Sequence, residues 1–234
     1  YGCTGLKTLY YNTPFNGYTN DRRASQFCNV GKESGELVLT IGRSIQKVYA
    51  RAFSPAYPSR LVFEEESRCE EIEAGTFSGK DLGGDLIFPA SMKRLGNNAF
   101  YGTLIGSVSL TENIEEIGSA AFASCSRLNK VEWNVPAIAT NESLFRCSGG
   151  SQGFVLVLGN AVRLLPDGLF ESEDIEDIEI EGFRHPEGKG IKQIIWPEDS
   201  HIDSIGRFTF AFNTLLAEAS IPCSVRGIGN NAFC

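Results

Sequence analysis

The sequence has little of what catalytic and metal sites most often use. Two His stand among 234 residues, and the seven Cys include no Cys-x-x-Cys pair, which disfavours zinc binding and His-based catalysis. No Gly-x-Gly-x-x-Gly follows a strand-like run, and Gly31-Lys32 lacks the flanking residues of a phosphate loop. We therefore expect a protein that is not an enzyme, with no cofactor and no metal.

Long apolar runs and an excess of positive charge are also lacking. No run of about eighteen apolar residues occurs, which predicts no membrane span in this chain. Lys and Arg number 21 against 29 Asp and Glu, a net charge of -8, which disfavours binding to nucleic acid. Apolar residues make up 42% and charged residues 21%, as in ordinary folded proteins.

A Phe recurs along the chain at nearly constant spacing. Successive anchors lie 22 to 26 residues apart, except for 40 between Phe170 and Phe210. The nine anchors are Phe27, Phe53, Phe77, Phe100, Phe122, Phe145, Phe170, Phe210 and Phe233. The clearest copies carry an Ile-Gly pair, as in Ile117-Gly-Ser-Ala-Ala-Phe122. Such a period indicates stacked units that share one core.

A short apolar alternation lies fourteen residues before most anchors. Leu86-Ile-Phe88 and Val131-Glu-Trp133 are examples, and a further apolar residue such as Met92 follows four residues later. These patterns predict one short parallel β-strand per repeat of about 23 residues, followed by a turn that carries the Phe. We expect residues 1–234 to form a single, mostly β solenoid of about nine repeats, with short helical turns.

The repeat resembles that of a known family. The segment 110–118, Leu-Thr-Glu-Asn-Ile-Glu-Glu-Ile-Gly, and the segment 121–128, Ala-Phe-Ala-Ser-Cys-Ser-Arg-Leu, match the two halves of the BspA-like leucine-rich repeat. The resemblance covers nearly the whole chain. It implies a leucine-rich-repeat solenoid, which is a right-handed superhelix. It also implies a surface protein of anaerobic bacteria or some protists, of a kind that adheres to host proteins or other cells.

The repeats follow a second, longer period. Aligning residue 1 with residue 123 places Cys3 opposite Cys125, and residues 96–100 match residues 229–233. Residues 1–100 therefore resemble 123–233, with 101–122 as an extra repeat. We expect a fragment of a longer array, in which the sequence after Cys234 resumes with a unit like 101–122.

The longest gap between anchors holds an insertion and an acidic run. About 17 extra residues around 181–190 are rich in Gly and Pro, which indicates a loop. We interpret it as a tolerated surface insertion, with a binding role as the alternative. Seven carboxylates within 171–181 alternate with Ile and lack the pattern of a calcium loop, which favours a solvated acidic face. His185 lies in the insertion, and His201 occupies a variable surface position.

The cysteines are expected to be mainly structural. Cys3 and Cys125 occupy the internal Cys position of the repeat, where a small apolar side chain packs in the core. Cys125 and Cys147 come from successive repeats, so a disulfide between them is an alternative to buried free thiols.

The middle residue of each expected strand points away from the core. These residues are Thr40, Val62, Ile87, Ser109, Glu132, Val157, Glu179, Ile195 and Ser220. Four of them are β-branched aliphatics. One interpretation is that they reflect strand propensity alone, and the other is that they form a partly apolar concave surface for a protein ligand. The candidate ligand-binding residues on this face are Val62, Ile87, Ser109, Glu132, Val157, Glu179 and Ile195.

The resemblance favours a non-enzymatic, secreted or cell-surface bacterial module for protein binding and adhesion. Its partner would be a host extracellular protein or another cell-surface protein. Two alternatives remain: a structural spacer, or an array that selects substrate for an enzyme domain elsewhere in the parent chain. Fold alone does not decide among them.

Overall fold

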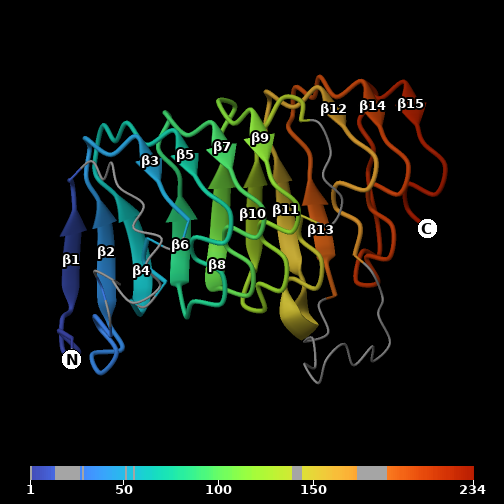
Figure 1. Cartoon of the computed structure of the whole chain (residues 1–234). Coiled ribbons are helices and arrows are strands. Elements are labelled where there is room, and N and C mark those ends of the chain that lie inside the picture. The colour runs from blue at the N-terminus through green and yellow to red at the C-terminus, as the bar shows by residue number, and fades with distance from the viewer. Residues whose placement is uncertain are drawn as a thin grey trace.

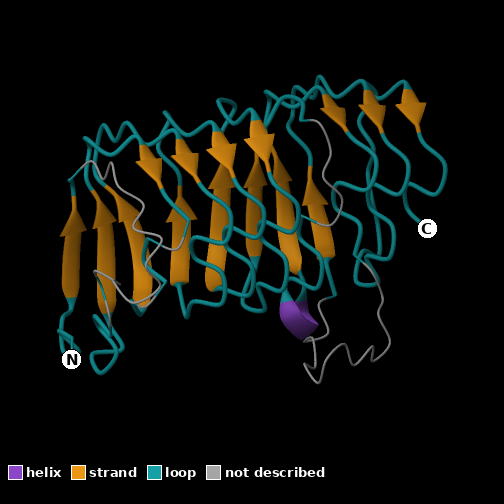
Figure 2. Cartoon of the chain, viewed as in Figure 1, coloured by secondary structure: helices purple, strands orange, loops and turns teal. Residues whose placement is uncertain are grey.

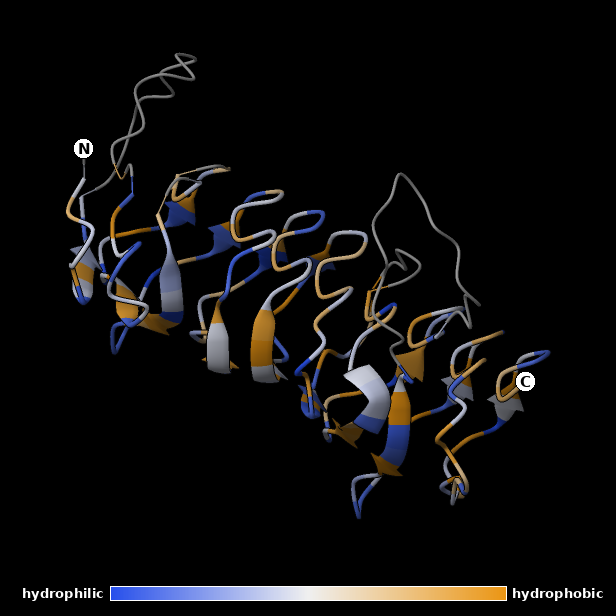
Figure 3. Ribbon diagram, turned by 90° about the horizontal axis from the view of Figure 1, so that it is seen from below, coloured by the Kyte–Doolittle hydropathy of each residue, from blue (hydrophilic) through white to orange (hydrophobic). Residues whose placement is uncertain are grey.

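The computed structural model describes residues 2–13, 27, 29–50, 52–54, 56–138, 144–172 and 189–234. The chain forms an elongated solenoid, with the two termini at opposite ends (Figure 1). Two rows of strands run along its length, one of longer strands and one of two-residue strands (Figure 2). Seen from below, the coils stack one after another in a line (Figure 3).

Longer strands form one side of the solenoid. They are β1 (Thr8–Tyr11), β2 (Leu37–Ile41), β4 (Pro58–Phe63), β6 (Gly83–Ile87), β8 (Leu104–Leu110), β10 (Lys130–Trp133), β11 (Phe154–Leu158) and β13 (Ile191–Ile195). The two-residue strands are β3 (Lys47–Val48), β5 (Glu71–Ile72), β7 (Arg94–Leu95), β9 (Glu116–Ile117), β12 (Leu164–Leu165), β14 (Ser204–Ile205) and β15 (Gly227–Ile228). A 3-10 turn, η1 (Gly150–Gln152), is the only helix in the part of the chain that the structure describes.

Every strand pairs in parallel with its equivalent in a neighbouring repeat. The longer strands form two sheets, in the orders β1-β2-β4 and β6-β8-β10-β11-β13. The short strands form the sheets β3-β5-β7-β9 and β12-β14-β15. The predicted parallel β-solenoid is confirmed, and the structure adds a second short strand to most repeats. Residues 219–221, predicted as a strand, form none, and Ser220 is exposed.

The anchor Phe side chains form one continuous column through the core. Successive rings, from Phe27 to Phe233, have centroids 5.1 to 6.0 Å apart and interplanar angles of 5° to 29°. Phe53, Phe77, Phe100 and Phe122 are fully buried. Phe145 stacks in the same column although its repeat lacks the Ile-Gly pair. The repeat register read from the anchors is therefore correct.

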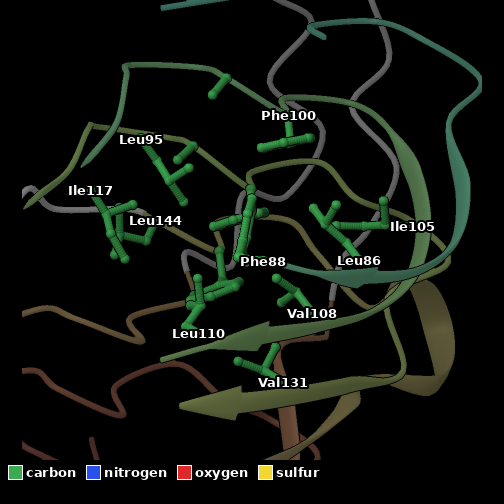
Figure 4. Packing of buried hydrophobic residues seen from close by; sticks show 14 of the residues in the cluster. Leu86, Phe88, Leu95, Phe100, Ile105, Val108, Leu110, Ile117, Val131 and Leu144 are labelled. Carbon is green, nitrogen blue, oxygen red and sulfur yellow. The ribbon is translucent and has the colours of Figure 1, made fainter. Parts of the chain in front are cut away.

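The rest of the core comes from both rows of strands. Leu86, Val108 and Val131 enter from the longer strands, and Leu95 and Ile117 enter from the short strands (Figure 4). All five are at most 2% exposed. Each repeat thus buries its apolar side only against its neighbours, as expected for stacked units.

The Gly of the Ile-Gly pair is required by close contact between repeats. A Cβ atom placed on Gly96 or Gly118 would lie 2.3 Å from a backbone nitrogen of the preceding repeat. The same test gives 2.4 Å at Gly206 and Gly229. Real Cβ atoms do not approach that closely, so these positions accept only Gly. The preceding Ile or Leu fills the core beside it.

The cysteines follow the predictions in part. Cys125 is a fully buried free thiol within hydrogen-bond distance of Thr103 Oγ1 (3.4 Å), so the disulfide considered with Cys147 does not form. Cys3 is exposed, and the prediction that it packs in the core is wrong. It lies at the end of the stack, where a neighbouring repeat covers it from one side only.

Candidate functional site

The predicted outward residues line up in register across the longer strands. Thr40 pairs with Val62 in one sheet, and Ile87, Ser109, Glu132, Val157 and Ile195 follow one another in the next. Tyr10 extends the line onto β1, where it pairs with Thr40. We call this set the outer row: Tyr10, Thr40, Val62, Ile87, Ser109, Glu132, Val157 and Ile195. Glu179, the remaining predicted site residue, lies outside the described residues.

Several outer-row side chains are large, apolar and exposed. Ile87 is 67% exposed, the highest value among the exposed large apolar residues of the described chain. Tyr10 is 56% and Ile195 is 44% exposed, while Val62 and Val157 are partly buried. The sequence interpretation missed Tyr10, although the longer period aligns it with Glu132 and so marks it as outward-facing.

The acidic member of the outer row is held by its neighbours. Glu132 accepts hydrogen bonds from Lys130 Nζ and Ser109 Oγ, both at 2.5 Å. These two contacts lower the pKa of Glu132, and the hydrogen bond from Lys130 has the larger effect. Glu132 therefore carries its charge at neutral pH. Because Lys130 balances that charge locally, Glu132 offers less attraction to a basic partner than an isolated carboxylate would.

A second line of outward side chains runs beside the outer row. Arg60, Asp85, Ser107 and Lys130 occupy the positions two residues earlier in their strands. Ser107 Oγ donates to Asp85 Oδ1 at 2.6 Å. The outer face therefore mixes aliphatic side chains with charges of both signs.

The two longer sheets meet at a break between β4 and β6. No backbone pairing joins these neighbouring strands, although both are fully described. A groove of about 430 Å³ lies on the outer face at this break, and its lining includes Val62 and Ile87 from the outer row. Two of the predicted site residues, Val62 and Ile87, thus line a hollow on this face.

A cluster of three side chains flanks the groove. Glu64 accepts hydrogen bonds from the Tyr10 hydroxyl at 2.7 Å, the Arg43 backbone N–H at 2.7 Å and the Arg43 guanidinium at 3.0 Å. Together these donors lower the pKa of Glu64 to about 2, and the Tyr10 hydroxyl has the largest effect. The cluster ties β1, β2 and the end of β4 together.

The described residues offer little for other chemistry. They contain no group of three His, Cys, Asp or Glu side chains able to hold a metal ion. His201 is exposed, as predicted, while His185 and the acidic run beyond Ser172 fall in the part of the chain left undescribed. None of the described helices is long and apolar enough to cross a membrane. The predicted site residues that the structure describes therefore lie on the face of the longer strands.

Comparisons with known proteins agree with the repeat pattern. No curated protein matches the chain. A leucine-rich repeat protein from Bacteroides ovatus is 17% identical, with 99% of this chain and 77% of that chain covered and a TM-score of 0.42. One from Eubacterium ventriosum is 13% identical, with 84% and 75% covered and a TM-score of 0.37. A leucine-rich cell surface protein from Faecalibacterium prausnitzii is 12% identical, with 82% and 78% covered and a TM-score of 0.26.

The family comparison covers most of the chain. The BspA type leucine-rich repeat region matches in six copies, over residues 70–185 and 173–234. The matched span contains the four glycines of the Ile-Gly pairs described above and the anchors from Phe77 to Phe233. The chain belongs to the BspA-type leucine-rich repeat family.

Proposed function

We propose that this chain is a non-enzymatic protein-binding module and that the outer row makes the contact. The observation that carries the proposal is the register: side chains from eight strands are aligned within the two sheets of longer strands, with exposed aliphatic groups among them. Apolar groups gathered on a wet face favour an interaction surface over simple solvation.

The backbone beneath the outer row suits this role. Each outward side chain stands on a strand whose alternate residues are buried, such as Val131 and Trp133 around Glu132. A rigid backbone presents its side chains with little further loss of conformational entropy when a partner binds. Exposed Ile87 and Ile195 would supply apolar contact, and the polar residues between them would set specificity.

Family membership supports a place for this module at the cell surface or in a secreted protein. We infer adhesion as the biological role, with a host extracellular protein or another cell-surface protein as the partner. The net charge of -8 favours a basic partner through long-range attraction.

The test uses a panel of purified extracellular proteins immobilised on a sensor. Ile87→Asp combined with Val157→Asp should weaken binding of any ligand found, while the melting temperature shifts by only a few degrees, because the core layers stay intact. The matched control is Leu164→Asp combined with Ile228→Asp, which places the same two charges at 37% and 52% exposed aliphatic positions in the row of short strands.

Two results would contradict the proposal. If both outer-row substitutions leave binding unchanged while deletion of residues 182–190 abolishes it, the inserted loop is the site. If the parent protein binds nothing on a broad panel, a spacer role or an array that serves a separate enzyme domain becomes the better account.

A further inference from the structure

The break between β4 and β6 coincides with a backbone irregularity at the start of β6. The register of β6 against β8 is irregular between Gly84 and Asp85, and Gly84 has a φ of +80°. Such an irregularity bends a strand and increases its twist. Gly83 and Gly84 contribute no side chains beside β4, and a Cβ atom at Gly84 would lie 3.9 Å from Arg60 Nε. The groove itself lies further along the two strands and is lined by residues from 60–67 and 85–91.

The lining of the groove is apolar in its middle and acidic at one end. Val62 and Ile87 line the groove from the two sides of the break, together with the buried Leu61 and Phe88. Glu65 and Glu66 follow β4 at one end of the groove, and both are exposed. Arg60 and Asp85 stand across the break at the other end.

The charges at the two ends differ in how far they are balanced. Glu64 is neutralised by Arg43. Arg60 and Asp85 carry opposite charges on neighbouring strands, so that end is nearly neutral overall. Neither Glu65 nor Glu66 forms an ion pair among the described residues, although Arg43 interacts with the charge of Glu66 from a longer distance. The groove lining holds the carboxylates Glu64, Glu65, Glu66 and Asp85 against the single cation Arg60, so its overall charge is negative.

We infer that this groove binds an extended, basic and aliphatic segment of the partner protein. An aliphatic side chain of the segment would cover Ile87 and Val62, and a Lys or Arg would lie beside Glu65 and Glu66. Val62 and Glu66 are four residues apart, at most about 13 Å along the chain, which an extended peptide spans in four residues. This inference rests on the proposed function and names the class of ligand.

Charge complementarity favours this occupant over a second copy of the chain. A second copy carries the same net charge of -8 and would be repelled. A basic segment would instead be attracted from a distance and held by the two carboxylates, which gain in strength where the apolar groups exclude water.

The test is a methyl NMR titration of the full chain with synthetic peptides. The probe is an eight-residue capped peptide of alternating Val and Lys. Matched peptides replace Lys by Glu or Val by Ser. The Val/Lys peptide should shift the methyl signals of Ile87 and Val62 and leave Ile195 unchanged, and the two matched peptides should bind more weakly.

Two pairs of substitutions separate the groove from general surface charge. Glu65→Gln with Glu66→Gln should weaken the Val/Lys peptide about fivefold or more and reduce the salt dependence of its binding. Glu115→Gln with Glu116→Gln removes the same charge from two adjacent exposed carboxylates near β9 and should leave binding unchanged.

Several outcomes would overturn the inference. The inference is wrong if the Val/Lys peptide does not bind, or if the Ser/Lys peptide binds equally well. It is also wrong if both substitution pairs weaken peptide binding equally, or if sedimentation shows a dimer of the chain that Ile87→Asp abolishes. The proposed function has a separate readout. If the panel ligand is lost with Val157→Asp and Ile195→Asp but not with Glu65→Gln and Glu66→Gln, the outer row stands and the groove does not.

Discussion

Phe122 shows how a single residue serves the whole array. Its ring lies between those of Phe100 and Phe145, with both centroid distances 5.5 Å, and it is 0% exposed. Removing it leaves a cavity that the flanking repeats cannot fill without shifting. We therefore expect Phe122→Ala to lower the free energy of unfolding by about 3–5 kcal/mol, measured by chemical denaturation.

Phe233→Ala is the matched control because Phe233 ends the same column and is 38% exposed. It should cost clearly less than Phe122→Ala. Equal losses, or a loss below about 1 kcal/mol for Phe122→Ala, would contradict the role of the column as the core.

Gly118 tests the close approach between repeats. A Cβ atom there would lie 2.3 Å from the backbone nitrogen of Asn97, so Gly118→Ala must push two repeats apart. We expect a loss of about 1–3 kcal/mol in the free energy of unfolding. Gly227→Ala is the control, since a Cβ atom there meets only Ser204 Cβ, at 3.9 Å. A Gly118→Ala variant as stable as the parent would show that the contact is not tight.

The reactivity of the thiols should depend on their burial. Burial raises the pKa of Cys69 to about 12 and that of Cys125 to about 11, so neither forms thiolate at pH 8. A thiol reagent at that pH should label exposed Cys223 in the native protein and reach Cys69 and Cys125 only after unfolding. Mass spectrometry of the labelled peptides reads the result. Rapid native labelling of Cys125 would contradict its placement in the core.

At the scale of elements, the Glu64 cluster should make the first strands sensitive to acid. The folded-state pKa of Glu64 is about 2, below the ordinary value of 4.5. Its stabilising contribution is therefore complete above about pH 4.5 and is lost as the pH falls towards 2. Glu64→Gln should be less stable than the parent at pH 7 and should lose less stability between pH 5 and pH 2. Denaturation midpoints across this range measure the effect.

Glu115→Gln provides the control for that experiment because it changes the same charge at an exposed position before β9. Its pH dependence should follow the parent. If Glu64→Gln also follows the parent throughout, the contacts with Tyr10 and Arg43 contribute nothing measurable.

How far each element could be predicted from the sequence depends on how many residues carry its pattern. The longer strands and the Phe column were predictable because buried residues such as Leu86 and Phe100 recur with the repeat. The short strands were not, since two residues such as Glu71–Ile72 give no alternation to recognise. The groove was missed for a different reason: it lies where β4 and β6 do not pair, and alternation along a single strand does not predict which neighbouring strands will pair.

The candidate site was predictable in position but not in chemistry. Alternation placed Ile87 and Val157 on one face, and the register confirms that they lie in one line with Ser109 and Glu132. The partner of Glu132 was missed, although Lys130 lies two residues away on the same strand and therefore on the same face.

At the scale of the whole molecule, two equivalent contacts support the proposal of a longer period, in which residues 1–100 correspond to residues 123–233. Asn12 and Asn134 are equivalent in that alignment, and each accepts a backbone hydrogen bond from the turn of the next repeat, from Ser44 at 2.9 Å and Ala161 at 3.0 Å. Each Asn also lies against an equivalent glycine, Gly42 or Gly159. Shared detail of this kind favours an array in which a block of repeats was duplicated.

The central claim is that the face of the longer strands, and not that of the short strands, meets the partner. Photo-cross-linking tests it most directly, with a photoreactive residue placed at position 87 in one variant and at position 116 in another. Position 87 lies in the outer row, and position 116 lies exposed in β9 among the short strands. With a ligand from the extracellular panel, the account predicts a covalent adduct from position 87 and none from position 116. An adduct from position 116 alone would contradict it.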